Sequence, residues 1–133
     1  MQVVVFKISD ELFAVETSKV QSITDMTEVT KVPKAPEHIR GLINLRGSII
    51  PLLDINLLLN ISKSSKVQSN IIILNVDDEQ VGISVDEVEE VLEIDEKLIQ
   101  RLENEKYQSY VKGIVNFDDK LVTLVDISKI LKI

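Results

Sequence analysis

The sequence predicts a mostly β protein, in which an internal repeat builds two small barrels that pack together, with a few short helices. Three observations carry this prediction. Apolar residues make up 44% of the 133 residues but aromatic residues only 4%, so Val, Ile and Leu dominate, which favours strands. Short apolar runs follow one another at close spacing, with turn residues between them. The second half of the chain also repeats the apolar pattern of the first half.

The repeat falls into two blocks. The segment VVFKISDELFAVETSKVQSI (4–23) lies over IIILNVDDEQVGISVDEVEEVL (71–92), with Glu11 aligned to Glu79. The segment IRGLINLRGSIIPLLDINLLL (39–59) lies over VKGIVNFDDKLVTLVDISKIL (111–131), with Gly41 aligned to Gly113. The offset therefore changes by four residues, from 68 to 72, and one loop must be longer in the second copy.

The first half of copy one reads as strands and a short helical turn. We expect a strand over Val3–Ile8, a turn at Ser9–Glu11 and a second strand over Leu12–Glu16. Thr17 and Ser18 are expected to cap a helical turn that runs through Val20. Further on, Glu28–Val32 is expected to be extended, and the prolines that follow mark a loop.

The second half of copy one reads as a hairpin, a short helix and a linker. Leu42–Leu45 and Ile49–Leu53 form the predicted hairpin, and Asp54 caps the helix INLLL. The Ser- and Lys-rich stretch Asn60–Asn70 has no apolar periodicity, so we expect a mobile linker between the copies. In copy two, Asp95 is expected to cap EKLIQRL, and NEKYQS to form a loop.

The length predicts one domain over residues 1–133, divided into two subdomains. Subdomain one is expected over about 12–62 and subdomain two over about 66–133. The strand at 3–8 is a candidate to complete subdomain two. Neither half is large enough to be stable alone, so the two must share a core.

Composition excludes several classes of function. A net charge of −7 argues against binding to nucleic acid or to an anionic membrane surface. The absence of cysteine excludes disulfides and thiol catalysis. The N-terminus lacks the basic region of a signal peptide, and no apolar run is long enough to insert in a bilayer. We therefore expect a cytoplasmic protein.

No pattern of catalytic residues is present, so the sequence predicts no enzyme, no metal and no cofactor. His38 is the only histidine and is expected to be a surface loop residue. Asp54 and Asp126 could form an acid–base pair, but each directly follows an apolar strand and opens a short helix, which favours N-capping. The acidic run at 77–79 is expected to be a hairpin turn, and the run at 86–90 a solvated face.

The local sequence explains Gly47 but does not explain the arginine at position 46. The pair Arg46–Gly47 fits a hairpin turn in which Gly47 supplies a positive φ angle. Turns favour Asn or Asp, however, and the aligned residues in copy two are Asp118 and Asp119. An arginine that projects from an apolar hairpin is typical of a protein-interface anchor.

The stretch IRGLINLRGSIIPLLDI (39–55) resembles the signature of the CheW-like domain family. The resemblance covers essentially the whole chain, because VVFKISDELFAVETSKVQSI, VTKVPKAPEHIRG and VGISVDEVEEVLEI match further motifs of the family in the expected order. It implies two five-stranded SH3-like β-barrels that pack on a shared hydrophobic core. The chain is similar to the stand-alone adaptors of the family, since it carries none of the kinase or receiver domains of its longer members.

The resemblance also implies a function. Members of this family couple the cytoplasmic tips of chemoreceptors to the histidine kinase CheA, through the CheW-like regulatory domain of the kinase, in arrays at the inner face of the membrane. The receptor tip docks in a groove between the barrels. The residues of this chain that match or border that surface are Val20, Ser22, Ile23, Leu45, Arg46, Val88 and Val91. No residue is assigned to the kinase contact.

One departure from the family and two alternatives stay open. Where some members carry a glutamate two positions after Val20, this chain has Ser22, so either Asp25 or Glu28 pairs with Arg46 or Arg46 is free to reach the receptor. The first alternative is a paralogue that serves another chemosensory system, such as type IV pilus motility. The second is a small-ligand-binding or catalytic double barrel that uses Asp54 and Asp126.

Overall fold

The fold is mostly β, as predicted, with two five-stranded sheets. The computed structural model describes residues 1–59, 61, 67–101 and 110–130. The first copy contains β1 (Gln2–Ile8), β2 (Glu11–Glu16), the 3₁₀ turn η1 (Thr17–Lys19), β3 (Val20–Asp25), β4 (Ile39–Leu45), β5 (Ser48–Leu53) and α1 (Ile55–Leu58). The second contains β6 (Asn70–Val76), β7 (Glu79–Val85), β8 (Glu87–Glu93), the 3₁₀ turn η2 (Glu96–Leu98), β9 (Val111–Phe117), β10 (Lys120–Val125) and α2 (Ile127–Ile130).

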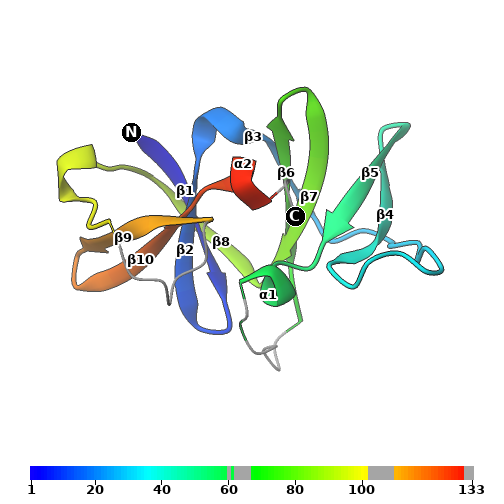
Figure 1. Ribbon diagram of the computed structural model, residues 1–133, viewed down its shortest axis with the longest axis horizontal. Coiled ribbons are helices and arrows are strands. Elements are labelled where there is room, and N and C mark those ends of the chain that lie inside the picture. Colours follow the sequence, from blue (N-terminus) through cyan, green and yellow to red (C-terminus); the bar gives the residue numbers. More distant parts are fainter. Residues whose placement is uncertain (60, 62–66, 102–109, 131–133) are drawn as a thin grey trace.

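The two sheets exchange their first hairpins. One sheet has the strand order β8-β1-β2-β10-β9 and the other β3-β6-β7-β5-β4. The hairpin β1–β2 of the first copy therefore lies among strands of the second copy, and β6–β7 of the second copy lies among strands of the first. Figure 1 shows this directly, because the blue β1–β2 hairpin sits beside orange β9 and β10, whereas green β6 and β7 sit beside β4 and β5.

Sheet membership consequently does not follow the linear division into 12–62 and 66–133. Strand β2 lies in the sheet of β8, β9 and β10, and strands β6 and β7 lie in the sheet of β3, β4 and β5. The N-terminal strand β1 also lies with β8, β9 and β10. Hairpin β1–β2 is joined to β3 by the three residues of η1, and the chain passes from one sheet to the other at this point.

Each exchanged hairpin pairs in antiparallel with an edge strand on one side and, over a shorter stretch, in parallel with an inner strand on the other. Strand β2 pairs with β10 in parallel at Leu12–Ala14, and β7 pairs with β5 in parallel at Gly82–Ile83. We call each parallel pairing a junction, and one polar contact lies beside each junction. Lys112 Nζ donates to Glu16 Oε1 at 2.6 Å in one, and Arg40 Nη1 donates to Ser84 Oγ at 2.7 Å in the other. The two junctions are therefore equivalent in the repeat.

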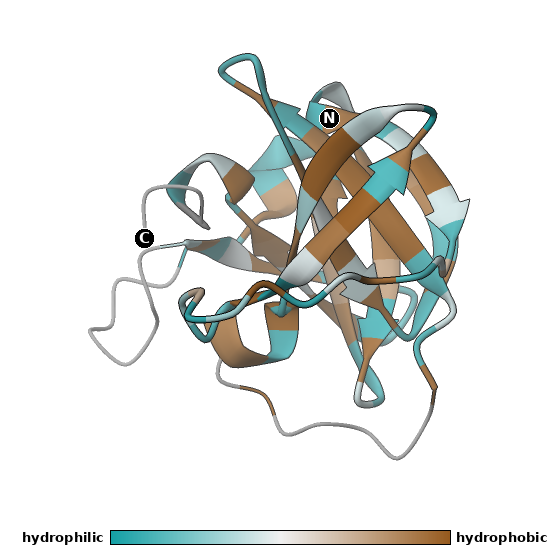
Figure 2. Cartoon of the chain, turned by 90° about the vertical axis from the view of Figure 1, so that its right-hand side faces the viewer, coloured by the Kyte–Doolittle hydropathy of each residue, from teal (hydrophilic) through white to brown (hydrophobic). Residues whose placement is uncertain are grey.

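The exchange creates one hydrophobic core between the two sheets and one further core within each sheet. Alternate side chains of β1 point to different cores. Val4, Phe6 and Ile8 belong to a cluster that also contains residues of β6 and β7. Val3 and Val5 pack only with residues of their own sheet and its flanking segments. A third cluster, around Ile43 and Ile73, lies inside the other sheet. Both faces of the central strands are thus buried, which explains their unbroken apolar runs. Figure 2 shows these strands as mostly hydrophobic, with hydrophilic residues gathered at the hairpin tips.

Two glycines sit at equivalent places because no side chain fits there. A Cβ on Gly113 would lie 2.6 Å from the carbonyl oxygen of Gln100, and one on Gly41 would clash with the carbonyl oxygen of Thr30. The cause is that Gln100 forms a bridge with Ile114, and Thr30 forms one with Leu42, each crossing beside the glycine. Close backbone approach of this kind requires glycine.

All four hairpins turn through two residues with positive φ, the pattern of type I′ turns. The turn pairs are Ser9–Asp10, Arg46–Gly47, Asp77–Asp78 and Asp118–Asp119. Asp54 Oδ1 accepts a hydrogen bond from the Leu57 amide, and Asp126 Oδ1 accepts one from the Ser128 amide. The predicted turns and the predicted capping roles of both aspartates are confirmed.

Two local predictions are wrong. The segment after β2 is not a helical turn through Val20 capped by Thr17 or Ser18, because Thr17 Oγ1 donates instead to the Gln2 carbonyl at 3.2 Å, and Val20 already begins β3. After Asp95 only a three-residue 3₁₀ turn forms, although Asp95 does accept from the Lys97 amide. The helix ends early because Gln100 must be extended to bridge Ile114.

The predicted linker and loop are only partly described. Residues 60 and 62–66 of the linker, and the predicted loop Asn104–Ser109, lie outside the described residues. The end of the linker is hydrogen-bonded rather than free, since Ser69 donates from its amide to the Val85 carbonyl at 3.2 Å and Asn70 begins β6. Backbone pairing therefore starts before the predicted boundary.

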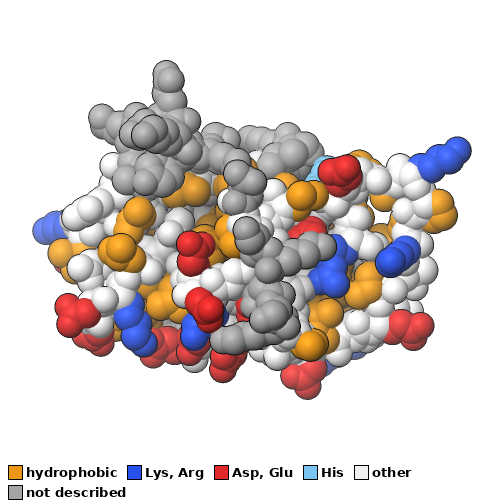
Figure 3. Space-filling model, turned by 90° about the horizontal axis from the view of Figure 1, so that it is seen from below, with side chains coloured by type: hydrophobic (Ala, Val, Ile, Leu, Met, Phe, Trp, Pro, Cys, Tyr) orange, Lys and Arg blue, Asp and Glu red, His pale blue; other side chains and the backbone are white. Residues whose placement is uncertain are grey.

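The surface matches the acidic composition. On the face shown in Figure 3, acidic side chains line the lower margin and others stand farther in, and hydrophobic side chains are scattered among polar ones. Within the described ranges, no helix has the length and apolar character that a membrane span requires.

Substituting Gly113 by alanine should destabilise the protein, because the new methyl group would overlap the Gln100 carbonyl. We expect a loss of about 1–3 kcal/mol in the free energy of unfolding, measured by urea denaturation. Leu121→Ala serves as the control, since Leu121 is 66% exposed in the neighbouring strand and its loss should cost under about 0.5 kcal/mol. Equal stability of Gly113→Ala and the wild type would contradict the close approach.

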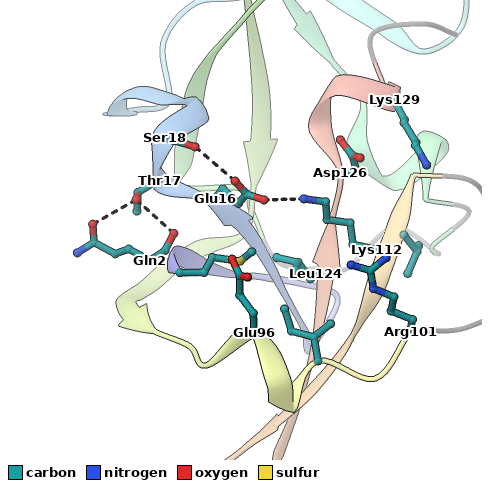
Figure 4. Close-up of a pocket in the computed structure, with 13 residues that line it drawn as sticks. Gln2, Glu16, Thr17, Ser18, Glu96, Arg101, Lys112, Leu124, Asp126 and Lys129 are labelled. Carbon is teal, nitrogen blue, oxygen red and sulfur yellow. Dashed lines mark hydrogen bonds and ion pairs between the residues drawn. The ribbon is translucent and has the colours of Figure 1, made fainter.

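The Glu16–Lys112 contact should make stability depend on pH. The hydrogen bond from Lys112, shown in Figure 4, lowers the pKa of Glu16 in the folded protein. Its stabilisation is therefore present above the pKa of the unfolded state and is lost as pH falls through the folded-state pKa. Glu16→Gln should cost up to about 1 kcal/mol at neutral pH, because the pair is partly exposed, and almost nothing in acid.

The measurement is the free energy of unfolding of Glu16→Gln and of the wild type, from neutral pH down to below the folded-state pKa of Glu16. Glu11→Gln, in the same strand, is the matched control because Glu11 makes no ion pair among the described residues. A wild-type advantage over Glu16→Gln that persists unchanged in acid would contradict the assignment.

Candidate functional site

Four of the seven predicted site residues line one hollow in the sheet of β3–β7. Ser22 and Ile23 come from β3, Leu45 from the end of β4, and Arg46 from the β4–β5 turn. The hollow has a volume of ≈ 610 Å³. Its remaining lining residues are Gln21, Thr24, Asp25, Ser48, Ile50, Asn70 and Gln80.

The position of this hollow follows from the curvature of the sheet. Strands β3 and β4 are the two edges of the sheet in the order β3-β6-β7-β5-β4. Residues from both edges nevertheless line the same hollow, so the sheet curls until its edges face each other. The hollow is the gap left where this curled sheet does not close.

A bulge in β3 places two apolar side chains on one face. The register of β3 against β6 shifts between Val20 and Ser22, so Val20 lies opposite Leu74 and Ile23 lies opposite Ile72. Leu74 and Ile72 both belong to the shared core, and cross-strand partners share a face. Val20 is half-buried against that core, whereas Ile23 is 41% exposed.

Val88 and Val91, which were predicted to line the other wall of the groove, are the repeat equivalents of Val20 and Ile23. The register of β8 against β1 also shifts, so Val88 lies opposite Phe6 and Val91 opposite Val4, both in the shared core. Val88 is half-buried against the core, and Val91 is 52% exposed. Val88 and Val91 do not line the hollow of β3 and β4; they lie on the edge strand of the other sheet.

Asn70 connects the two edge strands. Its Nδ2 donates to the Thr24 carbonyl of β3 at 3.4 Å, and its Oδ1 accepts from the Val88 amide of β8 at 3.4 Å. Asn70 also lines the hollow. The surface therefore runs from the hollow across Asn70 to β8, so all seven predicted residues belong to one region even though only four share the hollow.

Arg46 stands at the exposed tip of its hairpin. Its φ angle is +52°, in the left-handed region, where the equivalent positions of the other three turns hold Ser or Asp. The Gly47 amide donates to Asn44 Oδ1 at 2.9 Å, which fixes the turn. Asp25 lines the same hollow, yet within the described part of the chain Arg46 forms no ion pair with it or with Glu28. Its guanidinium is thus available to a partner.

The sequence analysis missed the polar residues of this surface. Gln80 Nε2 donates to Gln21 Oε1 at 2.6 Å, which ties the β6–β7 hairpin to β3 beside the hollow. Asn70 was placed in the linker and not in the site. The repeat alignment gives no signal for Gln21 and Gln80, because their proximity depends on the exchange of hairpins.

The two aspartates considered for catalysis act as helix caps. Asp54 and Asp126 cap α1 and α2, as described above, and the carbonyl of half-buried His38 accepts from the Asp54 amide at 2.8 Å. In the described part of the chain, no group of three or more His, Cys, Asp or Glu side chains is placed to hold a metal ion.

Comparison with known proteins gives a consistent result. The sequence profile of the CheW-like domain matches residues 2–133. The chain is 32% identical over 132 residues to the chemotaxis protein CheW of Thermotoga maritima, covering 98% of this chain and 87% of that protein. It is 28% identical to the chemotaxis protein CheW of Bacillus subtilis, covering 98% and 86% of the two chains.

A crystal structure agrees with these relatives. The scaffolding protein TtCheW of Thermoanaerobacter tengcongensis superposes with a TM-score of 0.86 at 35% identity, covering 93% of this chain and 82% of that chain. The arrangement of two curled sheets is therefore shared with a known scaffolding protein.

Replacing Arg46 by asparagine should stabilise the protein. A residue other than Gly, Asn or Asp in the left-handed region costs about 1–2 kcal/mol, and asparagine tolerates this conformation better than arginine. We expect the free energy of unfolding to rise by about 0.5–1 kcal/mol in urea denaturation. Arg46→Ala is the control, since it removes the charge but keeps the unfavourable φ. A loss of stability in Arg46→Asn would mean that the guanidinium makes a stabilising contact.

Proposed function

This chain belongs to the CheW-like domain family, and we propose that it is a non-enzymatic adaptor that couples the cytoplasmic tips of chemoreceptors to the histidine kinase CheA in bacterial chemotaxis. The observation that carries the proposal is the surface around Arg46. It combines a cation that makes no ion pair among the described residues with two half-exposed apolar pairs, Val20 with Ile23 and Val88 with Val91. A receptor array at the inner face of the membrane is where such a protein would act.

The apolar pairs suit a helical partner. Each pair lies three residues apart in sequence but on one face, because a bulge lies between its two members. The inner member of each pair packs on the core, and the outer member presents apolar area to solvent. Receptor tips are helical bundles, and an amphipathic helix buries its apolar face in a groove of this kind.

Arg46 would set the register of that helix. Charge-assisted hydrogen bonds are shorter and stronger than neutral ones, and an arginine fork is directional. The turn holds Arg46 at a fixed place through the Asn44–Gly47 hydrogen bond. A carboxylate or carbonyl oxygen of the receptor within reach of this fork would therefore lock the helix lengthwise, while the apolar pairs supply most of the buried area.

The kinase contact would use the ends of the sheets. Ile49 in β5 and Leu121 in β10 are repeat equivalents, and they are 61% and 66% exposed. Large apolar side chains exposed beside hairpin tips are suited to a partner of the same architecture. The CheW-like regulatory domain of CheA has that architecture within the family, so these two ends are the candidate kinase surfaces.

The test is an NMR titration of the isotope-labelled protein with the tip fragment of a chemoreceptor from the same organism. We expect shifts at Ile23, Arg46 and Val91. Arg46→Asn should bind at least about tenfold more weakly although it folds at least as well as wild type. Lys120→Glu, which changes a cation beside the equivalent turn in the other sheet, is the control and should bind normally.

The opposite results are equally informative. An absence of shifts with the folded wild-type protein would contradict the receptor surface, and the regulatory domain of CheA would then be titrated alone. Binding of the kinase domain without any receptor binding would favour a paralogue that serves another receptor class. Equal losses in Arg46→Asn and Lys120→Glu would show that net charge, rather than the Arg46 fork, drives binding.

A further inference from the structure

The bulge in β3 decides which of its side chains face the partner in the proposed receptor surface. The register of β3 against β6 skips Gln21, which is therefore an extra residue without a cross-strand partner. The residues that follow are paired again, so Ile23 lies opposite Ile72 of the shared core. If Ile23 were the extra residue instead, Ser22 would lie opposite Ile72, and the apolar side chain would leave this face.

The bulge in β8 has the same effect in the other sheet. The register of β8 against β1 skips Glu89, the repeat counterpart of Gln21, and places Val91 opposite Val4. If Val91 were the extra residue, Glu90 would take its place opposite Val4. The exposed member of each apolar pair therefore depends on where its bulge sits.

A side chain from each exchanged hairpin holds the extra residue. Gln80 Nε2 in β7 donates to Gln21 Oε1 in β3 at 2.6 Å, across β6, which lies between the two strands. Lys7 Nζ in β1 forms an ion pair with Glu89 Oε1 in β8 at 3.5 Å. We call these two contacts the braces. Each brace gives the extra residue a partner that the backbone pairing does not supply.

The two braces use different residues at the same place in the repeat. Lys7 aligns with Asn75, and Gln80 aligns with Leu12. The two positions are cross-strand partners in each hairpin, since Lys7 pairs with Leu12 and Asn75 pairs with Gln80. The cation of one brace therefore stands on the first strand of its hairpin, and the amide donor of the other brace stands on the second strand. Both bulges are braced, although the chemistry of the brace differs between the copies.

We propose that Gln80 and Lys7 are positioning residues of the receptor surface, which fix the two bulges and so keep Ile23 and Val91 turned toward the partner. This role rests on the proposed function, since the two apolar side chains matter only where a receptor docks. The braces respond differently to salt. An ion pair whose side chains are 31% and 34% exposed is screened by salt, whereas a hydrogen bond between two neutral amides is not.

The repeat provides the variant that tests Gln80. Gln80→Leu introduces the residue that the equivalent strand already accommodates. In the free variant we expect nuclear Overhauser contacts between Ile23 and Ile72 to weaken and contacts between Ser22 and Ile72 to appear. Binding of the receptor tip fragment should weaken about tenfold in an NMR titration. Glu79→Gln is the matched control, because exposed Glu79 lies in the same strand and forms no ion pair among the described residues.

A transplanted brace separates positioning from direct contact with the receptor, since Gln80 itself lines the hollow. The triple variant Asn75→Lys/Gln21→Glu/Gln80→Leu carries the ionic brace of the other sheet and leaves the net charge unchanged. It should recover the Ile23–Ile72 contacts and most of the affinity, although it still contains the Gln80→Leu change. Raising the salt concentration from about 0.1 M to about 1 M should remove the recovered contacts, and it should leave those of the wild type intact.

Lys7 is tested with one disruptive and one conservative variant. Lys7→Met removes the cation and keeps a long apolar side chain, whereas Lys7→Arg keeps the ion pair. The contacts between Val91 and Val4 in the free protein should weaken in Lys7→Met and persist in Lys7→Arg. Contacts that survive unchanged in Lys7→Met would overturn the role of Lys7.

The results for Gln80 decide the proposal in the same way. Unchanged Ile23–Ile72 contacts in Gln80→Leu would overturn it, and so would equal losses in Glu79→Gln. A loss of affinity that the transplanted brace does not recover would mean that Gln80 acts by touching the receptor, which also overturns the positioning role. If the wild type does not bind the receptor fragment, the proposed function fails, while the contacts in the free protein still decide whether Gln80 fixes the bulge.

Discussion

Each copy of the repeat begins with a hairpin that pairs with strands of the other copy and not with the later strands of its own. This exchange of hairpins constrains the rest of the molecule. Hairpin β1–β2 completes the sheet of β8, β9 and β10, and hairpin β6–β7 completes the sheet of β3, β4 and β5. Each sheet consequently contains strands from both copies, and the largest buried cluster joins the two. Dividing the chain at its linker would therefore remove two strands from each sheet.

The same constraint places the proposed receptor surface. Because the exchanged hairpins occupy inner positions, strands β3 and β8 are left at the sheet edges, each with a bulge and an apolar pair facing the shared core. The two edges are equivalent in backbone and apolar pattern but not in charge. Arg46 stands beside one of them, where the other copy has Asp118. A nearly symmetric scaffold therefore presents one distinctive cationic tip, and a partner that needs that cation has one place to dock.

The sequence predicted the turns and caps better than it predicted which strands pair with one another. The four hairpin turns, the caps at Asp54 and Asp126 and the repeat all depend on local residue chemistry, which a single sequence displays. Strand β3 was missed because its bulge breaks the alternation of apolar residues, so Val20–Asp25 does not show a strand period. Sheet membership could not be read from the pattern, because β2 has the same apolar faces whichever copy it joins. For the site, Arg46 was found as an anomaly of turn chemistry, whereas Gln21, Gln80 and Asn70 come together only through the exchange.

The exchange of hairpins also gives the chain the symmetry of a dimer. Two identical copies that traded hairpins would form a symmetric homodimer with both junctions alike. The present chain has the form of that homodimer with its subunits joined end to end. Joining them makes assembly independent of protein concentration, and it allows the two halves to diverge. The replacement of the Arg40–Ser84 contact by Lys112–Glu16, and of an aspartate turn by Arg46–Gly47, are differences that no dimer of identical subunits could carry.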